Sequence, residues 1–590
     1  MKSGFTLLLL LCSLCVNAQK YWIGSVDTNW NNGANWWPNG VPSSSDNVVI
    51  NGSNNTPVLP GNIGLGNLHM DWGSAINLDG KTVTVWMFST TGATVIANGG
   101  TIDAVRTGVY QGTTFRGAFT LKINRDGTND YLGAQYGANT YENDFTLECH
   151  TGNWTTYGIS NQVGDLFLGK TTIKNIGSGW LMVATNPSSN ATFKNDVTFH
   201  NANSYEGRIQ VGVYGGKIQC EKPVFIKDET VSWGSYITIT EGTFHDEVSI
   251  DAKVGVIGIG SQNTTTFKKN INITNRYGCV VEFGSHSGQV IFEKGSSFAI
   301  SSSVPMTRGQ LKFQRCTFEG DASTANTPLL LQVDNVPFSN SPTTYIILGD
   351  QITFQRPVKI RADYIYYKGC YFGYDVEMER TGSSNQLSGG YAGGFCHGGS
   401  TFMGKAAFIN SYGDNWILQG QEPDIFKDDV TFFQQSHPWG VLRLSYAGNT
   451  IYEGNVTVTA PTGTNNGVSW GESGGTTQLA AGKKLTVNST GYGWISLSNF
   501  NQLGTGTNHT LSSFGSFYVN NCTFASPLIA ESSRLFITNS TFYQPSFTKT
   551  GNGVDVSNGG NTFKGKVFIK NASSTGQIQF EDQNSTIVNP

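Results

Sequence analysis

The segments FMGKAAF (residues 402–408), FKDDVTF (426–432) and YEGNVTV (452–458) share one pattern and follow one another at nearly equal spacing. Each begins with an aromatic residue, continues through three residues to a small or branched apolar residue, and ends on a second apolar residue two positions later. Because alternate side chains of a strand point to the same face, the last two apolar residues share a face. The pattern therefore predicts a bend followed by a short strand with one buried face.

The same pattern recurs through most of the chain. We expect its first aromatic residue to stack in the interior at these positions: Phe193, Phe244, Phe267, Phe354, Phe402, Phe426, Tyr452 and Phe563. Some steps, such as that from Phe193 to Phe244, are close to twice the usual spacing, which predicts degenerate copies in between. Repeats of this kind, with alternating apolar strands and Gly, Asn or Asp at the corners, are typical of a solenoid whose coils are turns of sheet. The predicted fold is all-β, a parallel β-helix with about 25 residues per coil, right-handed because crossovers between parallel strands are.

Asparagine recurs eight residues after the aromatic residue in four copies, at Asn201, Asn275, Asn410 and Asn571. Asparagine tolerates the left-handed backbone of tight corners. We therefore expect these side chains to form a hydrogen-bonded ladder along one corner of the solenoid.

The composition excludes several classes of function. The chain has 590 residues, a net charge of −4 and 13% charged residues, where soluble domains usually carry ~25%. It has no basic surplus for binding nucleic acid. No apolar run long enough to cross a bilayer follows the N-terminal region, so no membrane span is expected.

Residues 1–18 are typical of a secretory signal peptide, with an apolar core from Phe5 to Leu11 and cleavage expected after Ala18. We expect residues 19–100 to form a Trp-rich N-terminal cap with the first coils, and residues 101–590 to form the β-helix repeats. The signal predicts a secreted protein, in the medium or on a bacterial cell surface. Seven cysteines remain after cleavage, at irregular spacing, which indicates buried unpaired thiols rather than a disulfide framework.

Tryptophan is concentrated at the start of the mature chain, at Trp22, Trp30, Trp36 and Trp37. These indoles could be platforms for sugar rings or an apolar lid over the first coil. Solenoids need capping units at their ends, which favours the lid.

The order Tyr21-Trp22, Asn35-Trp36, Gly40-Val-Pro42 and Asp46-Asn-Val48-Val-Ile50 resembles the opening of large secreted and cell-surface β-helix proteins of Bacteroidetes. The aromatic-x-Gly-x-Val-x-Ile coils resemble the repeats of the same adhesin-like proteins. The resemblance implies export, often by the type IX route. Such proteins commonly end in a β-sandwich sorting domain, whereas this sequence stops soon after a coil, so it is either part of a longer protein or displayed by other means.

Candidate catalytic groups are few. Asp424, Asp428 and Asp429 form the densest acidic group, about one coil after His397, and weakly resemble elements of the polygalacturonase family. The order is reversed, and Asp428 and Asp429 occupy the bend of the repeat, which favours a solvated corner. Residues 471–475 match G-x-S-x-G, but no helix is predicted to follow. A calcium site at residues 124–130 lacks a full ligand series, so a turn is favoured, and no catalytic residue, metal or cofactor is assigned.

Two functions remain open. The first is a non-catalytic extracellular β-helix that acts as a surface adhesin or as the structural subunit of a filament or sheath. Its partners would be surface glycans or other copies of itself, bound end to end or laterally. The alternative is a secreted polysaccharide lyase or glycoside hydrolase, which would need several acidic residues in a groove on adjacent coils.

Overall fold

The computed structural model of the chain describes residues 19–124, 137–152, 155–203, 206–231, 234–275, 278–302, 309–332, 345–382, 395–411, 415–435, 440–460, 467–489, 493–552, 557–578 and 586–588. The described elements are β-strands and two short 3-10 helices, η1 (Gly33–Asn35) and η2 (Val213–Gly215). Coil after coil pairs with the next in parallel register, which confirms the predicted parallel β-solenoid. The chain divides into two compact units, Met1–Cys279 with Gly284–Val290, and Val280–Phe283 with Ile291–Pro590.

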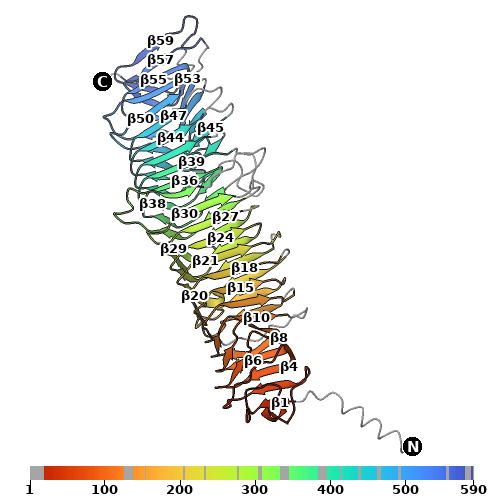
Figure 1. Ribbon diagram of the computed structural model, residues 1–590. Helices are drawn as coiled ribbons and strands as arrows, with labels where there is room; N and C mark the ends of the chain where they lie inside the picture. The colour runs from red at the N-terminus through yellow and green to blue at the C-terminus, as the bar shows by residue number, and fades with distance from the viewer. Residues whose placement is uncertain are drawn as a thin grey trace, which may run out of the picture. The chain divides into compact units, whose positions relative to one another are not determined.

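In its described residues the first unit has five consecutive coils that place one strand in each of three sheets, while the coils before them have none in the third. Figure 1 shows the strands stacked coil upon coil. The first sheet contains β2 (Trp36–Trp37), β1 (Gln19–Trp22), β3 (Asn47–Ile50), β4 (Ile63–Met70), β6 (Thr82–Thr91), β8 (Gly100–Gln111), β10 (Phe119–Ile123), β12 (Phe145–Cys149), β15 (Thr171–Asn175), β18 (Val197–Asn201), β21 (Val224–Asp228), β24 (Val248–Ala252) and β27 (Ile271–Asn275). The second sheet contains β5 (Ala75–Asn77), β7 (Thr94–Ile96), β9 (Thr114–Arg116), β11 (Thr140–Tyr141), β14 (Leu166–Phe167), β17 (Asn190–Phe193), β20 (Lys217–Cys220), β23 (Gly242–Phe244) and β26 (Thr264–Phe267). The third sheet contains β13 (Thr156–Ile159), β16 (Trp180–Val183), β19 (Arg208–Val211), β22 (Tyr236–Ile239) and β25 (Val256–Ile259).

The second unit is built in the same way. Its first sheet contains β33 (Leu329–Gln332), β36 (Val358–Ala362), β39 (Val376–Arg380), β41 (Ala406–Asn410), β44 (Val430–Gln434), β47 (Val456–Ala460), β50 (Leu485–Ser489), β53 (His509–Asn520), β55 (Leu528–Thr538), β57 (Ser546–Lys549) and β59 (Phe568–Asn571). Its second sheet contains β32 (Cys316–Phe318), β35 (Ile352–Phe354), β38 (Cys370–Phe372), β40 (Thr401–Phe402), β43 (Ile425–Phe426), β46 (Thr450–Tyr452), β49 (Thr477–Leu479), β52 (Phe500–Gln502), β54 (Thr523–Phe524), β56 (Thr541–Tyr543), β58 (Thr562–Lys564) and β60 (Thr586–Val588). The remaining side is formed by β28 (Val280–Phe283), β31 (Gln310–Phe313), β34 (Tyr345–Leu348) and β37 (Tyr364–Tyr367), and then by β42 (Trp416–Ile417), β45 (Val441–Leu444), β48 (Gly467–Trp470) and β51 (Trp494–Ser498). Two further strands are β29 (Gln289–Phe292) and β30 (Phe298–Ser302).

Coil length varies more than the sequence repeat indicates. Thr171 pairs with Val197, and Val197 pairs with Val224, and both steps are close to the expected coil length. Gly100 pairs with Phe119, which is a clearly shorter step. The expected length therefore describes the middle coils, while the early coils are shorter.

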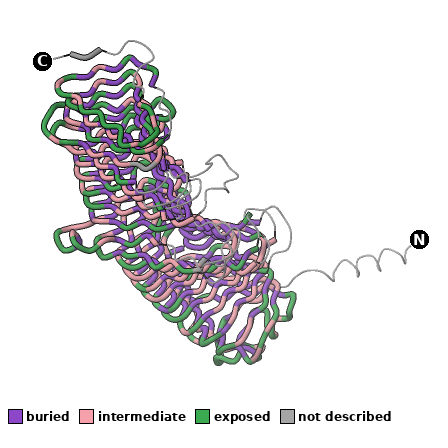
Figure 2. The backbone as a smooth tube through the Cα atoms, turned by 90° about the horizontal axis from the view of Figure 1, so that it is seen from above, coloured by how far each residue is buried: buried purple, intermediate pink, exposed green. Residues whose placement is uncertain are grey.

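The eight ladder aromatics are all buried, with exposed fractions of at most 6%. Phe402 stacks on Phe426 with ring centroids 4.6 Å apart and planes 9° from parallel, and Phe244 stacks in the same way on Phe267 at 4.8 Å. The degenerate copies are present, since Cys220 occupies the position between Phe193 and Phe244. In Figure 2 buried and more exposed residues alternate along the strands, as the period of two requires.

The seven cysteines of the described chain are free and buried, as the sequence predicts. Burial raises the pKa of Cys396 and of Cys522 to about 12, because the thiolate loses its hydration inside the core. Thiolates are the reactive species, so these groups are inert in the folded protein.

We expect a thiol reagent such as DTNB to label none of the seven cysteines in the native protein and all seven in 6 M guanidinium chloride. Absorbance of the released thionitrobenzoate measures the number of accessible thiols. Rapid labelling of even one thiol without denaturant would contradict the burial described here.

Candidate binding surface

Three of the four N-terminal tryptophans form one buried cluster. Trp36 meets Trp22 and Trp30 edge to face, with ring centroids 4.9 and 4.7 Å apart. Their exposed fractions are 1 to 2%. The indole N–H of Trp22 donates to the carbonyl of Asn55 at 2.8 Å, and that of Trp36 to the carbonyl of Trp30 at 2.8 Å. Buried indoles with satisfied N–H groups have no free face for a sugar ring.

The strand that carries Trp36, β2, also closes the edge of its sheet. β2 pairs with β1 in antiparallel register, unlike the parallel pairs that follow, and it is only two residues long. Short edge strands resist the addition of further strands. Trp37 alone is exposed, at 62%, and contacts Tyr21. The geometry favours the lid for Trp22, Trp30 and Trp36.

Replacing Trp36 with Ala is expected to lower the free energy of unfolding by about 3–5 kcal/mol, the range for buried aromatic residues. The matched change Trp37→Ala removes an exposed ring and should alter stability by less than about 0.5 kcal/mol. Urea unfolding followed by circular dichroism measures both variants. Equal losses for the two would contradict the assignment of Trp36 to the lid.

The expected asparagine ladder is only partly present. Asn201 is a buried strand end whose side chain donates to the carbonyl of Gly207 at 2.7 Å, and not to a neighbouring asparagine. Asn410 does bond the next coil, donating to Gln434 Oε1 at 2.8 Å. Asn571 is exposed and donates to the carbonyl of Gly576 at 2.7 Å, while the side chain of Asn275 lies outside the described residues.

The asparagines do not have the left-handed backbone that this residue type tolerates at tight corners. Asn201, Asn410 and Asn571 end extended strands, because they pair in register with the adjacent coils. Left-handed residues instead follow directly after third-sheet strands, at Ser160, Ala184, Gly212 and Gly260.

A different polar ladder runs along the bend before the first-sheet strands. Asp375 Oδ1 accepts from the backbone N–H of Lys405 at 2.8 Å, and Asp429 Oδ1 accepts from that of Asn455 at 2.8 Å. Asn455 Oδ1 in turn accepts from the N–H of Lys484 at 3.0 Å. Asp429 and Asn455 lie three residues after the ladder aromatic of their coils, so Asp or Asn at that position was the signal for this ladder. These side chains satisfy backbone donors that the corner would otherwise leave without partners.

The carboxylates of Asp424 and Asp165 lie inside the solenoid. Asp424 Oδ1 accepts from the N–H of Ser400 at 2.8 Å, and its Oδ2 accepts from the hydroxyl of Tyr367 at 2.7 Å and from Gln419. Asp165 similarly accepts from the N–H of Asn139 at 2.8 Å and from the hydroxyl of Ser160 at 2.7 Å. Burial raises the pKa of each carboxyl from 3.8 to about 6, against the opposing effect of these hydrogen bonds.

A folded-state pKa above the unfolded value means that the folded protein binds more protons between about pH 4 and pH 6. The contribution of Asp424 to stability is therefore present below about pH 4 and lost as the pH rises through about 6, by roughly 3 kcal/mol. We expect the urea midpoint of Asp424→Asn to change less between pH 4.5 and pH 7.5 than that of the unaltered protein. An identical pH dependence in the two proteins would contradict this assignment.

The candidate catalytic groups are held in structural interactions. Asp428 lies in the bend before β44, where it accepts from the N–H of Asp429 at 2.7 Å. His397 Nδ1 lies 3.7 Å from Glu422 Oε1, at the corner that precedes β40. Gly471 to Gly475 form a turn between strands, without the helix that a nucleophile elbow requires. The proposed calcium segment lies outside the described residues beyond Asn124.

Charged side chains on the outer faces pair between neighbouring coils. Lys122 and Glu148 occupy register partners on β10 and β12 with an N–O distance of 3.2 Å. Further pairs between coils, all within ion-pair distance, are Lys170–Asp196, Lys194–Glu221, Lys359–Glu377, Arg361–Glu379 and Lys427–Glu453. Such exposed pairs contribute little stability each, but they cancel charge along the faces.

Between the charged rows run columns of threonine. On the outer face of the first sheet of the first unit, six threonines are register partners on consecutive strands: Thr82, Thr101, Thr120, Thr146, Thr172 and Thr198. The first sheet of the second unit has four more in succession: Thr431, Thr457, Thr486 and Thr510. All ten are partly or fully exposed. Sequence reasoning missed these columns because threonine at an outward strand position is not unusual in any one coil.

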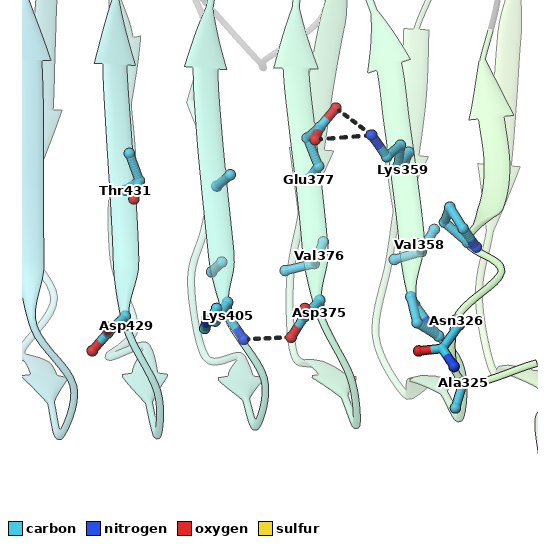
Figure 3. A pocket seen from close by; sticks show the side chains of 14 residues that line it. Ala325, Asn326, Val358, Lys359, Asp375, Val376, Glu377, Lys405, Asp429 and Thr431 are labelled. Carbon is cyan, nitrogen blue, oxygen red and sulfur yellow. Dashed lines mark hydrogen bonds and ion pairs between the residues drawn. The ribbon is translucent and has the colours of Figure 1, made fainter. Parts of the chain in front are cut away.

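A cleft of about 610 Å³ opens on the outer face of the second unit, across β36, β39, β41 and β44 (Figure 3). One end is bounded by the segment before β33, which contributes Ala325, Asn326 and Pro328. The floor includes the outward residues of these strands, Lys359, Glu377, Ala407 and Thr431. The corner residues that line it are Pro357, Asp375, Lys405 and Asp429.

Comparisons with protein-family models, with curated proteins and with solved structures gave no match to this chain. In the described part of the chain no helix is long and apolar enough to cross a membrane. The same residues contain no group of three or more His, Cys, Asp or Glu side chains placed to hold a metal ion.

Proposed function

We propose that the protein is a non-catalytic, exported adhesin that binds polymeric glycans through the repetitive outer faces of its solenoid. The observation that carries the proposal is the threonine columns. Hydroxyl groups on successive coils give equivalent contacts at strand spacing, ~4.8 Å. A polymer lying along the column makes the same weak contact many times, and linked weak contacts sum to a strong one.

Two residues of the acidic group that the sequence offered as a catalytic candidate have structural roles. Most glycoside hydrolases use two carboxyl groups that face a bound sugar. Asp424 is enclosed in the interior and Asp429 is bonded to the corner backbone. Export rests on the signal-like residues 1–18, which lie outside the described residues, and on the resemblance to Bacteroidetes surface proteins.

The proposal is tested by incubating the mature chain, residues 19–590, with insoluble cellulose, chitin, mannan and β-1,3-glucan and measuring the bound fraction. We expect binding to at least one of them without release of reducing ends. The double variant Thr457→Asp, Thr486→Asp in the second-unit column should bind at least about tenfold more weakly, the loss typical of important contact residues, because carboxylates interrupt the column. The control Thr457→Ser, Thr486→Ser keeps the hydroxyls and should bind as the unaltered chain does.

Release of reducing ends would favour the polysaccharide-degrading alternative over an adhesin. Absence of binding together with concentration-dependent polymerisation in sedimentation velocity would favour a structural filament subunit. Absence of both would overturn the proposed function.

Export makes a separate prediction. Protein recovered from the medium or the cell surface of the native bacterium should begin at Gln19, and protease added to intact cells should degrade it. N-terminal sequencing and immunoblotting measure these two properties. A cytoplasmic protein that keeps Met1 would contradict export.

A further inference from the structure

The floor of the cleft on the second unit contains one small outward side chain. In the column Lys359, Glu377, Ala407 and Thr431, the residue on β41 is alanine. Its methyl group leaves the surface low between the longer Glu377 and Thr431. The segment at Ala325 and Asn326 closes one end, as Figure 3 shows.

Several polar groups of the cleft already have hydrogen-bond or ion-pair partners, and those of Asp375 and Asp429 are corner backbone groups. Glu377 pairs with Lys359 at 3.1 Å, Asp375 accepts from the N–H of Lys405, and Asp429 accepts from the N–H and side chain of Asn455. Acceptors held by such bonds lose little freedom when a ligand binds. The carboxylates keep further lone pairs for a ligand, because each carboxylate has about four acceptor sites.

The charge of the lining argues against a polyelectrolyte ligand. Three carboxylates, those of Asp375, Glu377 and Asp429, stand with two ammonium groups, those of Lys359 and Lys405, so the formal sum is −3 + 2 = −1. A polyanion would be repelled by the carboxylates, and a polycation would gain little from a sum near zero. Neutral hydroxyl groups both donate and accept, so they match a lining that mixes acceptors and donors.

Two outward columns continue beyond the cleft without a charged residue for several coils. The column that contains Ala407 and Thr431 goes on through Thr457, Thr486 and Thr510. The adjacent outward column reads Ile409, Phe433, Thr459, Asn488 and Ser512. Phe433 is partly exposed and stands two residues after Thr431 on β44, where its ring offers an apolar platform.

We propose that this cleft is the main subsite for a neutral polysaccharide chain, which runs from the cleft over Phe433 and along the threonine column of the second unit. The carboxylates and lysines of the cleft bond the hydroxyls of the first sugars, and the ring of Phe433 contacts the apolar face of a pyranose. The inference rests on the proposed adhesin function and names one site and one ligand class for it.

The test is affinity gel electrophoresis of the mature chain in gels that contain hydroxyethyl cellulose, galactomannan or alginate. We expect retardation by at least one of the two neutral polymers and none by the polyanion alginate. Ala407→Phe, which fills the floor, and Phe433→Ala, which removes the platform, should each weaken retardation about tenfold, as for central contact residues.

Matched controls lie on the second sheet of the second unit, which does not line the cleft. Tyr371 and Thr401 are outward register partners on β38 and β40, so Tyr371→Ala and Thr401→Phe make comparable changes on another sheet. Both should leave retardation unchanged. Two different substitutions at the cleft keep the test valid if one variant fails to fold.

The outcomes separate this proposal from the one on which it rests. If a neutral polymer retards the chain and neither Ala407→Phe nor Phe433→Ala weakens this retardation, the cleft is not the binding site, but the adhesin function stands. Retardation by alginate alone would have the same meaning. If neither these polymers nor the insoluble glycans bind the chain, both the cleft proposal and the adhesin function are overturned. If the chain hydrolyses a neutral polymer and Glu377→Gln abolishes this hydrolysis, the cleft is a sugar site, but the protein is an enzyme and not a non-catalytic adhesin.

Discussion

Parallel register between neighbouring coils is the constraint on which the rest of this structure depends. Each strand hydrogen-bonds to the equivalent strand of the next coil, so each residue stands directly over its counterpart, as Thr146 does over Thr172. A residue that suits a given position in one coil therefore lies next to the same residue type, or a complementary one, at the same position in the two neighbouring coils. Stacked phenylalanines, paired Lys and Glu, and threonine columns all follow from this one relation.

The sequence predicts the core of this fold well and its corners poorly. Ladder aromatics such as Phe402 and Phe426 are visible because each is followed by an alternating strand, and a buried aromatic column tolerates few replacements. Cys220 continues the column where the pattern is degraded, and Phe372 continues it at the start of a further copy of the pattern, FGYDVEM (372–378). Corner ladders are harder to recognise, because any side chain with a carbonyl oxygen can accept the next backbone N–H.

The candidate site was out of reach of sequence reasoning for a different reason. Glu377, Ala407 and Thr431 become neighbours only through the register, and the two steps between them differ in length along the chain. A constant repeat period would bring other residues together. The lid tryptophans, by contrast, were recognisable as a group because they lie close together in the sequence, although which of them are buried depends on packing.

Unequal coil lengths have a consequence for how such a chain changes over time. The step from Val358 to Val376 is much shorter than the next, from Val376 to Ala406, yet both end in the same register. Residues can thus be inserted or deleted at a corner without shifting a single core position. Inserted segments at separate corners would vary independently on an unchanged scaffold, which makes the solenoid a suitable frame for displaying engineered peptide loops.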